Sequence, residues 1–218
     1  MNRRSPNRSA TPKLRDRLRE ATAEAILGAA ETVFGQAGLH AARMEAIAAE
    51  AGVAVGTLYN HFKDRERLLD ALVDARRAEL LGRLDAALAD SRGAPFDAQL
   101  RVFVGALTEH FEAHKPYLSI MMEVEASQNC RTFPVAIHKP RQSRRTMEEI
   151  HVRVAKLIDR GLAAKALRRN DADIYPTVLM GMVRSFMVRR LFHDNPKPLP
   201  LTQRVDQMTR FFLNGAGV

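Results

Sequence analysis

The chain has 218 residues, of which 46% are hydrophobic, so it can build a sizeable core and disorder is not expected. The formal net charge of +9 favours an anionic partner, with nucleic acid ahead of a membrane surface. The single cysteine, Cys130, excludes an internal disulfide and fits a reducing cytoplasm. No apolar run reaches the roughly 18 residues of a membrane span, and no apolar segment follows the basic N-terminus as a secretory signal requires.

Residues 1–19 are predicted to form a flexible basic arm. Seven cations there face one acid, Asp16, and Pro6 and Pro12 discourage regular structure. The arm is interpreted either as a solvated tail or as a segment that lies along DNA phosphates or enters a minor groove.

A first helix is predicted from Glu20 to Ala37, because apolar residues recur there at helical spacing and Gly38 follows. Two short helices follow within residues 44–62, joined by a turn at Gly52 and Val53. The second, from about Val55 to His61, turns Leu58 inward and polar residues outward. Two short helices joined at a glycine are typical of a helix-turn-helix, whose second helix fits a DNA major groove.

A long helix is predicted from Lys63 and Asp64 to about Asp90, with Asp64 as its cap. It would join the two halves of the chain as a rigid element. Further helices are expected at about 95–114, 117–127, 135–166, 172–192 and 202–213, with Pro116 ending the first of these. The basic run at 139–169 is interpreted as a solvated helix face, or as a source of one arginine, Arg144 or Arg145, for an acidic ligand group. No strand pattern interrupts this all-α fold.

The stretch AGVAVGTLYNHFKDRERLL resembles the DNA-binding region of the TetR family of bacterial transcriptional regulators, and the resemblance covers about residues 20–75. Arg43 and Ala54 stand where that family commonly has capping Thr and Ser, and neither caps a helix well. The resemblance implies DNA contacts from Gly56, Thr57, Tyr59 and Lys63. The complete predicted set of DNA-binding residues is Arg43, Val55, Gly56, Thr57, Tyr59, Asn60, His61 and Lys63.

The second half of the chain carries apolar residues that are interpreted either as plain core or as the lining of an apolar ligand pocket. The predicted pocket residues are Phe103, Leu107, Phe111, Met121, Met122, Met180 and Phe186. The last two helices are predicted to form the dimer interface, where the family also has a four-helix bundle. The predicted interface residues are Leu179, Met182, Val183, Phe186, Met187, Val205, Met208 and Phe212.

No catalytic site, cofactor or metal is predicted. The motifs GxSxG, GxxxxGK, GxGxxG and CxxC are all missing, and the pair His110 and His114 alone is weak evidence for a metal.

The sequence therefore predicts an all-α protein with a three-helix helix-turn-helix DNA-binding domain at 20–66 and a larger helical ligand-binding and dimerisation domain at 67–218. Its expected function is that of a cytoplasmic homodimer that represses transcription at a palindromic double-stranded operator and is released by a small, largely apolar effector. The alternatives are an activator, an architectural DNA-binding protein without an effector, and an enzyme with an accessory helix-turn-helix.

Overall fold

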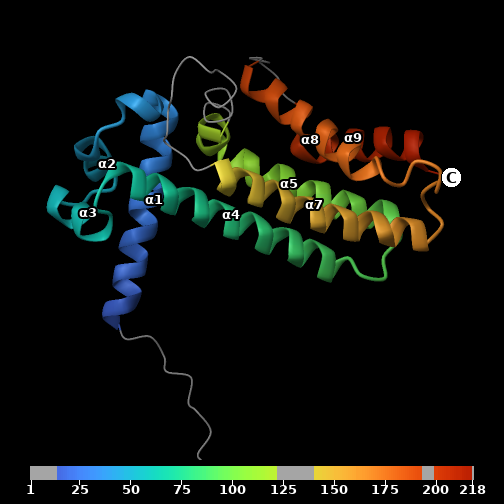
Figure 1. Cartoon of the computed structure of the whole chain (residues 1–218), viewed down its shortest axis with the longest axis horizontal. Helices are drawn as coiled ribbons and strands as arrows, with labels where there is room; N and C mark the ends of the chain where they lie inside the picture. Colours follow the sequence, from blue (N-terminus) through green and yellow to red (C-terminus); the bar gives the residue numbers. More distant parts are fainter. Residues whose placement is uncertain (1–13, 122–139, 193–198, 218) are drawn as a thin grey trace, which may run out of the picture.

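The computed structural model describes residues 14–121, 140–192 and 199–217, except for the side chains of 140–144 and 190–192 (Figure 1). Helices make up nearly all of this part of the chain, and its extended pairing is a single isolated bridge between Leu167 and Gly217. The all-α prediction is confirmed. Within the described ranges, none of the helices is long and apolar enough to cross a membrane.

The N-terminal domain is built from α1 (Leu14–Ala41), α2 (Met44–Glu50) and α3 (Val55–His61). Gly38 leaves the helical conformation at φ 78° and kinks the end of α1, at the glycine where the sequence predicts the helix to stop. The core of this domain also takes in the first half of α4 and residues from the 115–121 segment. Its fully buried side chains include Ile26, Phe34, Ile47, Leu58, Leu68, Leu69, Leu72 and Ile120.

The predicted flexible arm is wrong in its last six residues, because α1 begins at Leu14 rather than at Glu20. The reason is local, since neither proline nor glycine occurs between Leu14 and Ile26, and Asp16 lies in the positively polarised first turn. These first turns extend from the domain, and Leu14 and Leu18 are largely exposed (Figure 1). Residues 1–13 of the predicted arm lie outside the described residues.

The long helix α4 (Arg65–Asp90) runs from the helix-turn-helix to the far end of the second domain (Figure 1). The carboxylate of Asp64 accepts a hydrogen bond from the backbone N–H of Arg67 at 2.7 Å, so the predicted cap is confirmed. Arg65 donates from Nη1 to the backbone carbonyls of Leu39 and His40, at 2.8 and 3.0 Å. The start of α4 is thereby fixed to the end of α1.

The C-terminal domain adds α5 (Phe96–Ala113), α7 (Pro140–Ala163), α8 (Tyr175–Phe192) and α9 (Leu201–Ala216). Their bounds lie close to the predicted ones, although residues 135–139 and 122–127 of two predicted helices lie outside the described part. The sequence predicts that Pro116 ends this helix, but α5 already ends at Ala113 and Pro116 is not its last residue. It lies in the first turn of a helical segment at 115–121, where proline is tolerated because its missing N–H has no helical partner.

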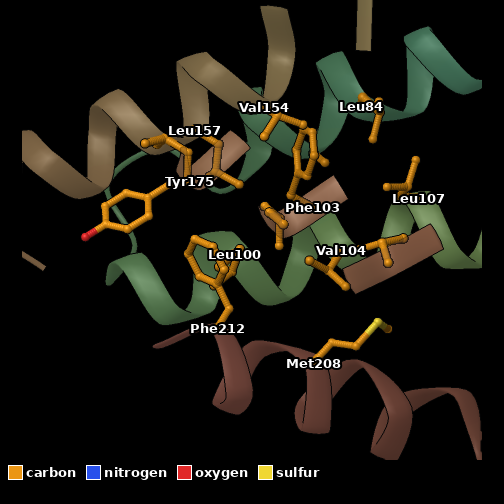
Figure 2. Close-up of a cluster of buried hydrophobic side chains, with 14 of the residues drawn as sticks. Leu84, Leu100, Phe103, Val104, Leu107, Val154, Leu157, Tyr175, Met208 and Phe212 are labelled. Carbon is orange, nitrogen blue, oxygen red and sulfur yellow. The ribbon is translucent and has the colours of Figure 1, made fainter. Parts of the chain in front are cut away.

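The C-terminal core lies between α5 and the helices that surround it, and Figure 2 shows it in close-up. Phe103 and Val104 of α5 point into the cluster that Val154 and Leu157 of α7 complete from the other side. Gly161 packs so tightly that a Cβ there would stand 2.7 Å from Leu167 and the Phe96 ring. This close packing fixes the helices that surround the candidate ligand pocket.

Candidate nucleic-acid interface and ligand pocket

The turn between α2 and α3 has the geometry of a helix-turn-helix. Gly52 adopts φ 66°, which an L side chain rarely takes, and its N–H donates to the carbonyl of Ala49 at 3.1 Å. The N–H of Val53 then donates to the carbonyl of Ala48 at 3.0 Å. Leu58 is completely buried beneath α3, which leaves the opposite face of that helix to solvent.

Packing rather than capping holds the two short helices. Arg43 and Ala54 occupy the N-cap positions of α2 and α3, and neither side chain makes a capping hydrogen bond to the described backbone. The expected weakness of these caps is confirmed. The buried side chains Met44, Ile47 and Leu58 therefore fix where α3 lies.

The outer face of α3 carries most of the side chains predicted to contact DNA, with Arg43 at the start of α2 and Lys63 after α3, and all of them retain solvent exposure. Val55 and Tyr59 are 37% and 44% exposed, large fractions for apolar and aromatic side chains. A Cβ built on Gly56 would meet no described heavy atom within 4 Å, so a second molecule can approach the backbone there. The remaining predicted residues are exposed or half-buried at Arg43, Thr57, Asn60, His61 and Lys63.

The first turns of α1 contribute residues to this face that the sequence does not assign to it. Arg15 and Arg19 line a shallow hollow together with Thr22, Asn60 and His61. Two cations therefore stand beside the end of α3 on a helix instead of a flexible arm. The absence of helix-breaking residues after Lys13 is the sequence signal that would have located them.

The C-terminal domain contains a largely apolar cavity of about 420 Å³ between α4, α5, the 115–121 segment, α7 and α8. This volume lies in the range of pockets that bind small molecules. Its apolar lining consists of Val73, Leu80, Leu107, Phe111, Tyr117, Leu118, Met121, Met147, Ile150, Met180, Val183, Met187 and Val188.

The predicted pocket residues divide between this cavity and other places. Leu107, Phe111, Met121 and Met180 line it. Phe103 does not, because its ring is buried in the C-terminal core. Phe186 lines a separate, much smaller hollow. Met122 lies outside the described residues.

Polar groups enter the cavity at a few points, among them Arg77, Thr146, His151, Thr177 and Arg184. Arg77 donates from Nη1 to the Glu149 carboxylate at 2.6 Å, a hydrogen bond that raises the pKa of Arg77 and lowers that of Glu149 against the effect of burial. The buried Nε of Arg77 has no hydrogen-bond partner among the described residues. Nothing in the sequence distinguishes Arg77, which lines the cavity, from the other arginines of α4.

The sequence suggests that the basic run of α7 is a solvated face. In the structure, some of its arginines bind a neighbouring helix instead. Arg153 pairs with Asp85 at 2.6 Å, and Arg160 donates to the Leu88 carbonyl at 2.7 Å, so both tie α7 to α4. Arg145, a predicted acid-binding candidate, pairs with Glu149 on its own helix and does not line the cavity. The side chain of Arg144 is outside the described part.

A buried charge cluster joins the two domains. Arg76 of α4 is only 6% exposed, and its Nε donates to Glu31 of α1 at 2.7 Å. Its Nη1 donates to Glu24 at 2.9 Å. His114, after α5, places Nδ1 3.1 Å from both oxygens of the same Glu31 carboxylate. Side chains of α1, α4 and α5 therefore meet at one buried carboxylate.

The residues predicted for the dimer interface differ in how much surface they expose on a single protomer. Five of the predicted side chains are inside the protomer's own core, because α8 and α9 turn them toward α5: Leu179, Val183, Val205, Met208 and Phe212. Met182, Phe186 and Met187 are half-buried. Among the described side chains of α8 and α9, the large apolar ones that are exposed are Val178, at 48%, and Phe211, at 65%.

Comparison with known proteins gives a family match at the helix-turn-helix. Residues 26–72 match the family model described as bacterial regulatory proteins, tetR family. The HTH-type transcriptional regulator UidR of Escherichia coli is 42% identical over 55 residues, which are 24% of this chain and 28% of that protein. The sequence match thus spans less than a third of this curated relative.

Solved structures resemble the whole chain in fold. The ketosteroid transcriptional regulator KstR2 of Mycobacterium tuberculosis has a TM-score of 0.67 at 22% identity, covering 90% of this chain and 95% of that one. FadR of Bacillus subtilis, solved in complex with stearoyl-CoA, has a TM-score of 0.66 at 17% identity, covering 88% and 98%. The fold likeness therefore extends through both domains.

Proposed function

This chain belongs to the TetR family of bacterial regulatory proteins, and we propose that it is a ligand-released transcriptional repressor. In this proposal a homodimer binds a palindromic operator through α3 of each protomer. A small, largely apolar molecule in the cavity of about 420 Å³ then weakens operator binding.

The observation that carries the proposal is that one rigid helix serves both sites. Arg65, at the start of α4, is bonded to the end of α1 beside the helix-turn-helix. Two and four turns further along, Val73 and Leu80 of the same helix line the cavity. A ligand that shifts α4 there also shifts the α3 helices relative to each other.

The energetic requirement of this mechanism is modest. The dimer exchanges between arrangements that differ in the separation of the two α3 helices, and only one matches successive major grooves. A ligand that prefers the other arrangement lowers operator affinity by its differential binding, typically 1–3 kcal/mol.

The dimer itself is proposed from symmetry and exposed apolar surface. One short reading helix contacts too few bases for specific binding, and two-fold dimers on palindromes are the common solution. Val178 and Phe211 are large exposed apolar side chains among the described residues of α8 and α9. We expect these two side chains, with the half-buried Met182, to pack against a second copy.

The proposed ligand class is a long acyl chain with an acidic head group. The cavity supplies a long apolar lining and the unpartnered Arg77 Nε, which can donate to a carboxylate. The B. subtilis FadR structure holds an acyl-CoA, stearoyl-CoA, in the same fold. A steroid ketone is the competing class, suggested by the name of KstR2.

Binding measurements with two probes separate these ligand classes. A fluorescent long-chain fatty acid should bind the wild type and be displaced by unlabelled acid but not by a steroid ketone. Arg77→Met should weaken acid binding about 10–100-fold and leave binding of the uncharged methyl ester unchanged. Equal loss for acid and ester, or displacement by the steroid alone, would remove the acyl-acid assignment.

A cavity-filling variant tests whether the cavity is the binding site. Gly181 lines it, and a Cβ added there meets no described atom within 4 Å, so Gly181→Phe should fold and occlude the ligand. Gly82→Phe, at an exposed glycine of α4 with the same free space, is the matched control. Dimer mass should be measured for both variants, because Gly181 lies on α8.

Selection of bound DNA from a random pool tests the function as a whole. Recovery of an inverted repeat is expected, and Thr57→Ala and Tyr59→Ala should each weaken binding to it. Recovery of no consensus, with salt-sensitive binding to any duplex, would instead support the architectural alternative. A reporter placed behind the recovered site distinguishes repression from activation.

A further inference from the structure

A group of metal-ligating side chains lies at the domain junction, apart from both the DNA-binding face and the cavity. Glu79 projects from α4, His110 from the last turns of α5, and His114 from the residue that follows α5. One ligand atom from each side chain lies within 4.8 Å of the other two. The Nε2 of His114 is 3.1 Å from Oε2 of Glu79, and Nδ1 of His110 is 3.8 Å from Oε1.

His110 is the feature that ordinary packing does not explain. Its side chain is completely buried, and neither ring nitrogen has a hydrogen-bond partner in the described part of the chain. Buried polar groups are nearly always satisfied, and an orphaned one destabilises the fold. The ring faces His114, with 4.8 Å between the ring centroids. A buried, unpartnered imidazole beside a second imidazole and a carboxylate is suited to a cation.

We propose that Glu79, His110 and His114 form a binding site for a divalent transition-metal ion of the zinc class. Two imidazole nitrogens and one carboxylate oxygen are a known three-ligand set for Zn²⁺, with a fourth position open to water. Imidazole donors disfavour Mg²⁺ and Ca²⁺, which take oxygen ligands.

The present separations suit that ion. Ligand atoms around a tetrahedral Zn²⁺ are about 3.3 Å apart, given metal–ligand bonds of about 2.0–2.1 Å. Measured to one carboxylate oxygen, Oε1 of Glu79, Nε2 of His114 lies at 3.3 Å and Nδ1 of His110 at 3.8 Å. The two histidines are four residues apart along one helical turn, a spacing at which both can contact one metal ion. Side-chain rotations are therefore enough to form the site.

The surroundings orient His114 for coordination. The Glu31 carboxylate lies 3.1 Å from Nδ1 of His114, and in the tautomer with the hydrogen on Nδ1 this N–H donates a hydrogen bond to Glu31 and leaves Nε2 facing Glu79. A carboxylate behind a ligating histidine is the usual second layer of a zinc site. Burial and the neighbouring His114 lower the pKa of His110 to about 4, so its imidazole is in the neutral form that metals bind.

A metal ion can reach the site, and Glu79 can bind it while keeping another partner. The side chain of Glu79 is 31% exposed and that of His114 is 15% exposed, so the cluster opens to solvent. Oε1 of Glu79 accepts a hydrogen bond from Arg83 at 3.0 Å, which orients the carboxylate, and Oε2 lies 3.1 Å from Nε2 of His114 and 3.5 Å from Nη1 of Arg76. The competing occupant is a proton on Nε2 of His114, although that proton would leave His110 unpartnered.

The test is a titration of the full-length protein after treatment with a chelator. Zn²⁺ binding is measured by calorimetry, and Co²⁺ binding by the visible absorption that a low-coordinate site produces. We expect one ion per protomer and a metal-dependent rise in Tm. Glu79→Gln and His110→Gln should abolish this binding, and Glu31→Gln should weaken it about 10–100-fold.

The matched control is His40→Ala, which removes an exposed histidine of α1 outside the cluster and should bind as the wild type does. Circular dichroism checks the fold of each variant, and Glu79→Gln decides the question if His110→Gln does not fold. If Glu79→Gln binds the metal with the affinity of the wild type, the metal is held by surface histidines and the proposal is overturned. Failure of the wild type to bind either ion would overturn it as well, leaving a proton as the occupant.

Discussion

Gly35 of α1 and Pro116 are packed so closely that a Cβ on the glycine would stand 2.4 Å from the proline Cβ and 2.9 Å from its Cα. Pro116 lies in the helical segment that leads toward the cavity wall at Tyr117 and Leu118. The N-terminal domain is therefore packed on the 115–121 segment at a place where any side chain larger than glycine forces a shift.

We expect Gly35→Ala to destabilise the protein by about 1–3 kcal/mol and to alter the effect of ligand on operator affinity, because α1 must move away from Pro116. Urea unfolding and operator titrations with and without ligand measure the two effects. Gly28→Ala is the control, since the same helix has free space there. Alanine should stabilise that position by about 0.5–1 kcal/mol. Equal behaviour of both variants would contradict the close packing.

Arg76→Met should cost about 3–5 kcal/mol of stability, because it leaves the Glu31 carboxylate buried without its guanidinium. Thermal and urea unfolding measure the loss. Arg101→Ala breaks a pair with Asp206 whose side chains are 46% and 57% exposed, so that control should lose about 0–1 kcal/mol. The double variant Arg76→Met, Glu31→Leu should recover part of the stability lost in Arg76→Met. If it recovers none, the unpaired Glu31 carboxylate is not the cause of that loss.

Two single substitutions should separate phosphate contacts from base reading. Lys63→Ala is expected to weaken binding about equally for all sequences and to reduce the salt slope by about 1. Asn60→Ala should cost about 1–3 kcal/mol and relax the preference at one base pair. Fluorescence anisotropy over a range of salt concentrations measures both. Lys156→Ala, an exposed lysine of α7, is the control, and a loss of sequence preference in Lys63→Ala would reverse the two roles.

The stability of the metal-free protein should fall as the pH drops from about 6.5 toward 4. Burial above all, with the charges of His114, Arg83 and Arg76 and against that of Glu79, lowers the pKa of His110 from 6.5 to about 4. In this window the unfolded chain binds a proton that the folded chain does not, so acid favours unfolding. Above pH 6.5 the effect disappears.

Urea unfolding at several pH values, with a chelator present, tests this dependence. The slope of stability against pH should be smaller in His110→Leu than in the wild type, by up to one proton between pH 4 and 6.5. Parallel curves for the two proteins would show that other groups carry the pH dependence.

Local chemistry made the helix-turn-helix predictable. Gly52, Leu58 and Asp64 each define a turn, a buried contact or a cap within a few residues of sequence, and the structure places them as expected. The start of α1 is harder to predict, because the basic composition of residues 1–19 indicates a flexible arm while the absence of breaking residues after Lys13 indicates a helix. Helix propensity without tertiary packing is a weak signal, and Leu14 and Leu18 contact little of the protein.

The junction and the dimer face were not predictable for a different reason. Arg76 and Glu31 are 45 positions apart, and no spacing rule indicates that they meet. In α8 the apolar residues occur on most sides of the helix, so its sequence does not distinguish the inward side chain of Leu179 from the outward one of Val178. Only the packing of α8 against α5 decides between these faces.

The burial of Leu179, Val183, Met208 and Phe212 within a single protomer has a consequence for gene control. Because these side chains are already packed inside one protomer, we expect the proposed pairing to be a reversible step that depends on protein concentration. At low concentration the DNA-binding species then grows with the square of the expression level. If the protein is the repressor proposed above, the expression level of this one chain would set the concentration at which its target promoter is silenced.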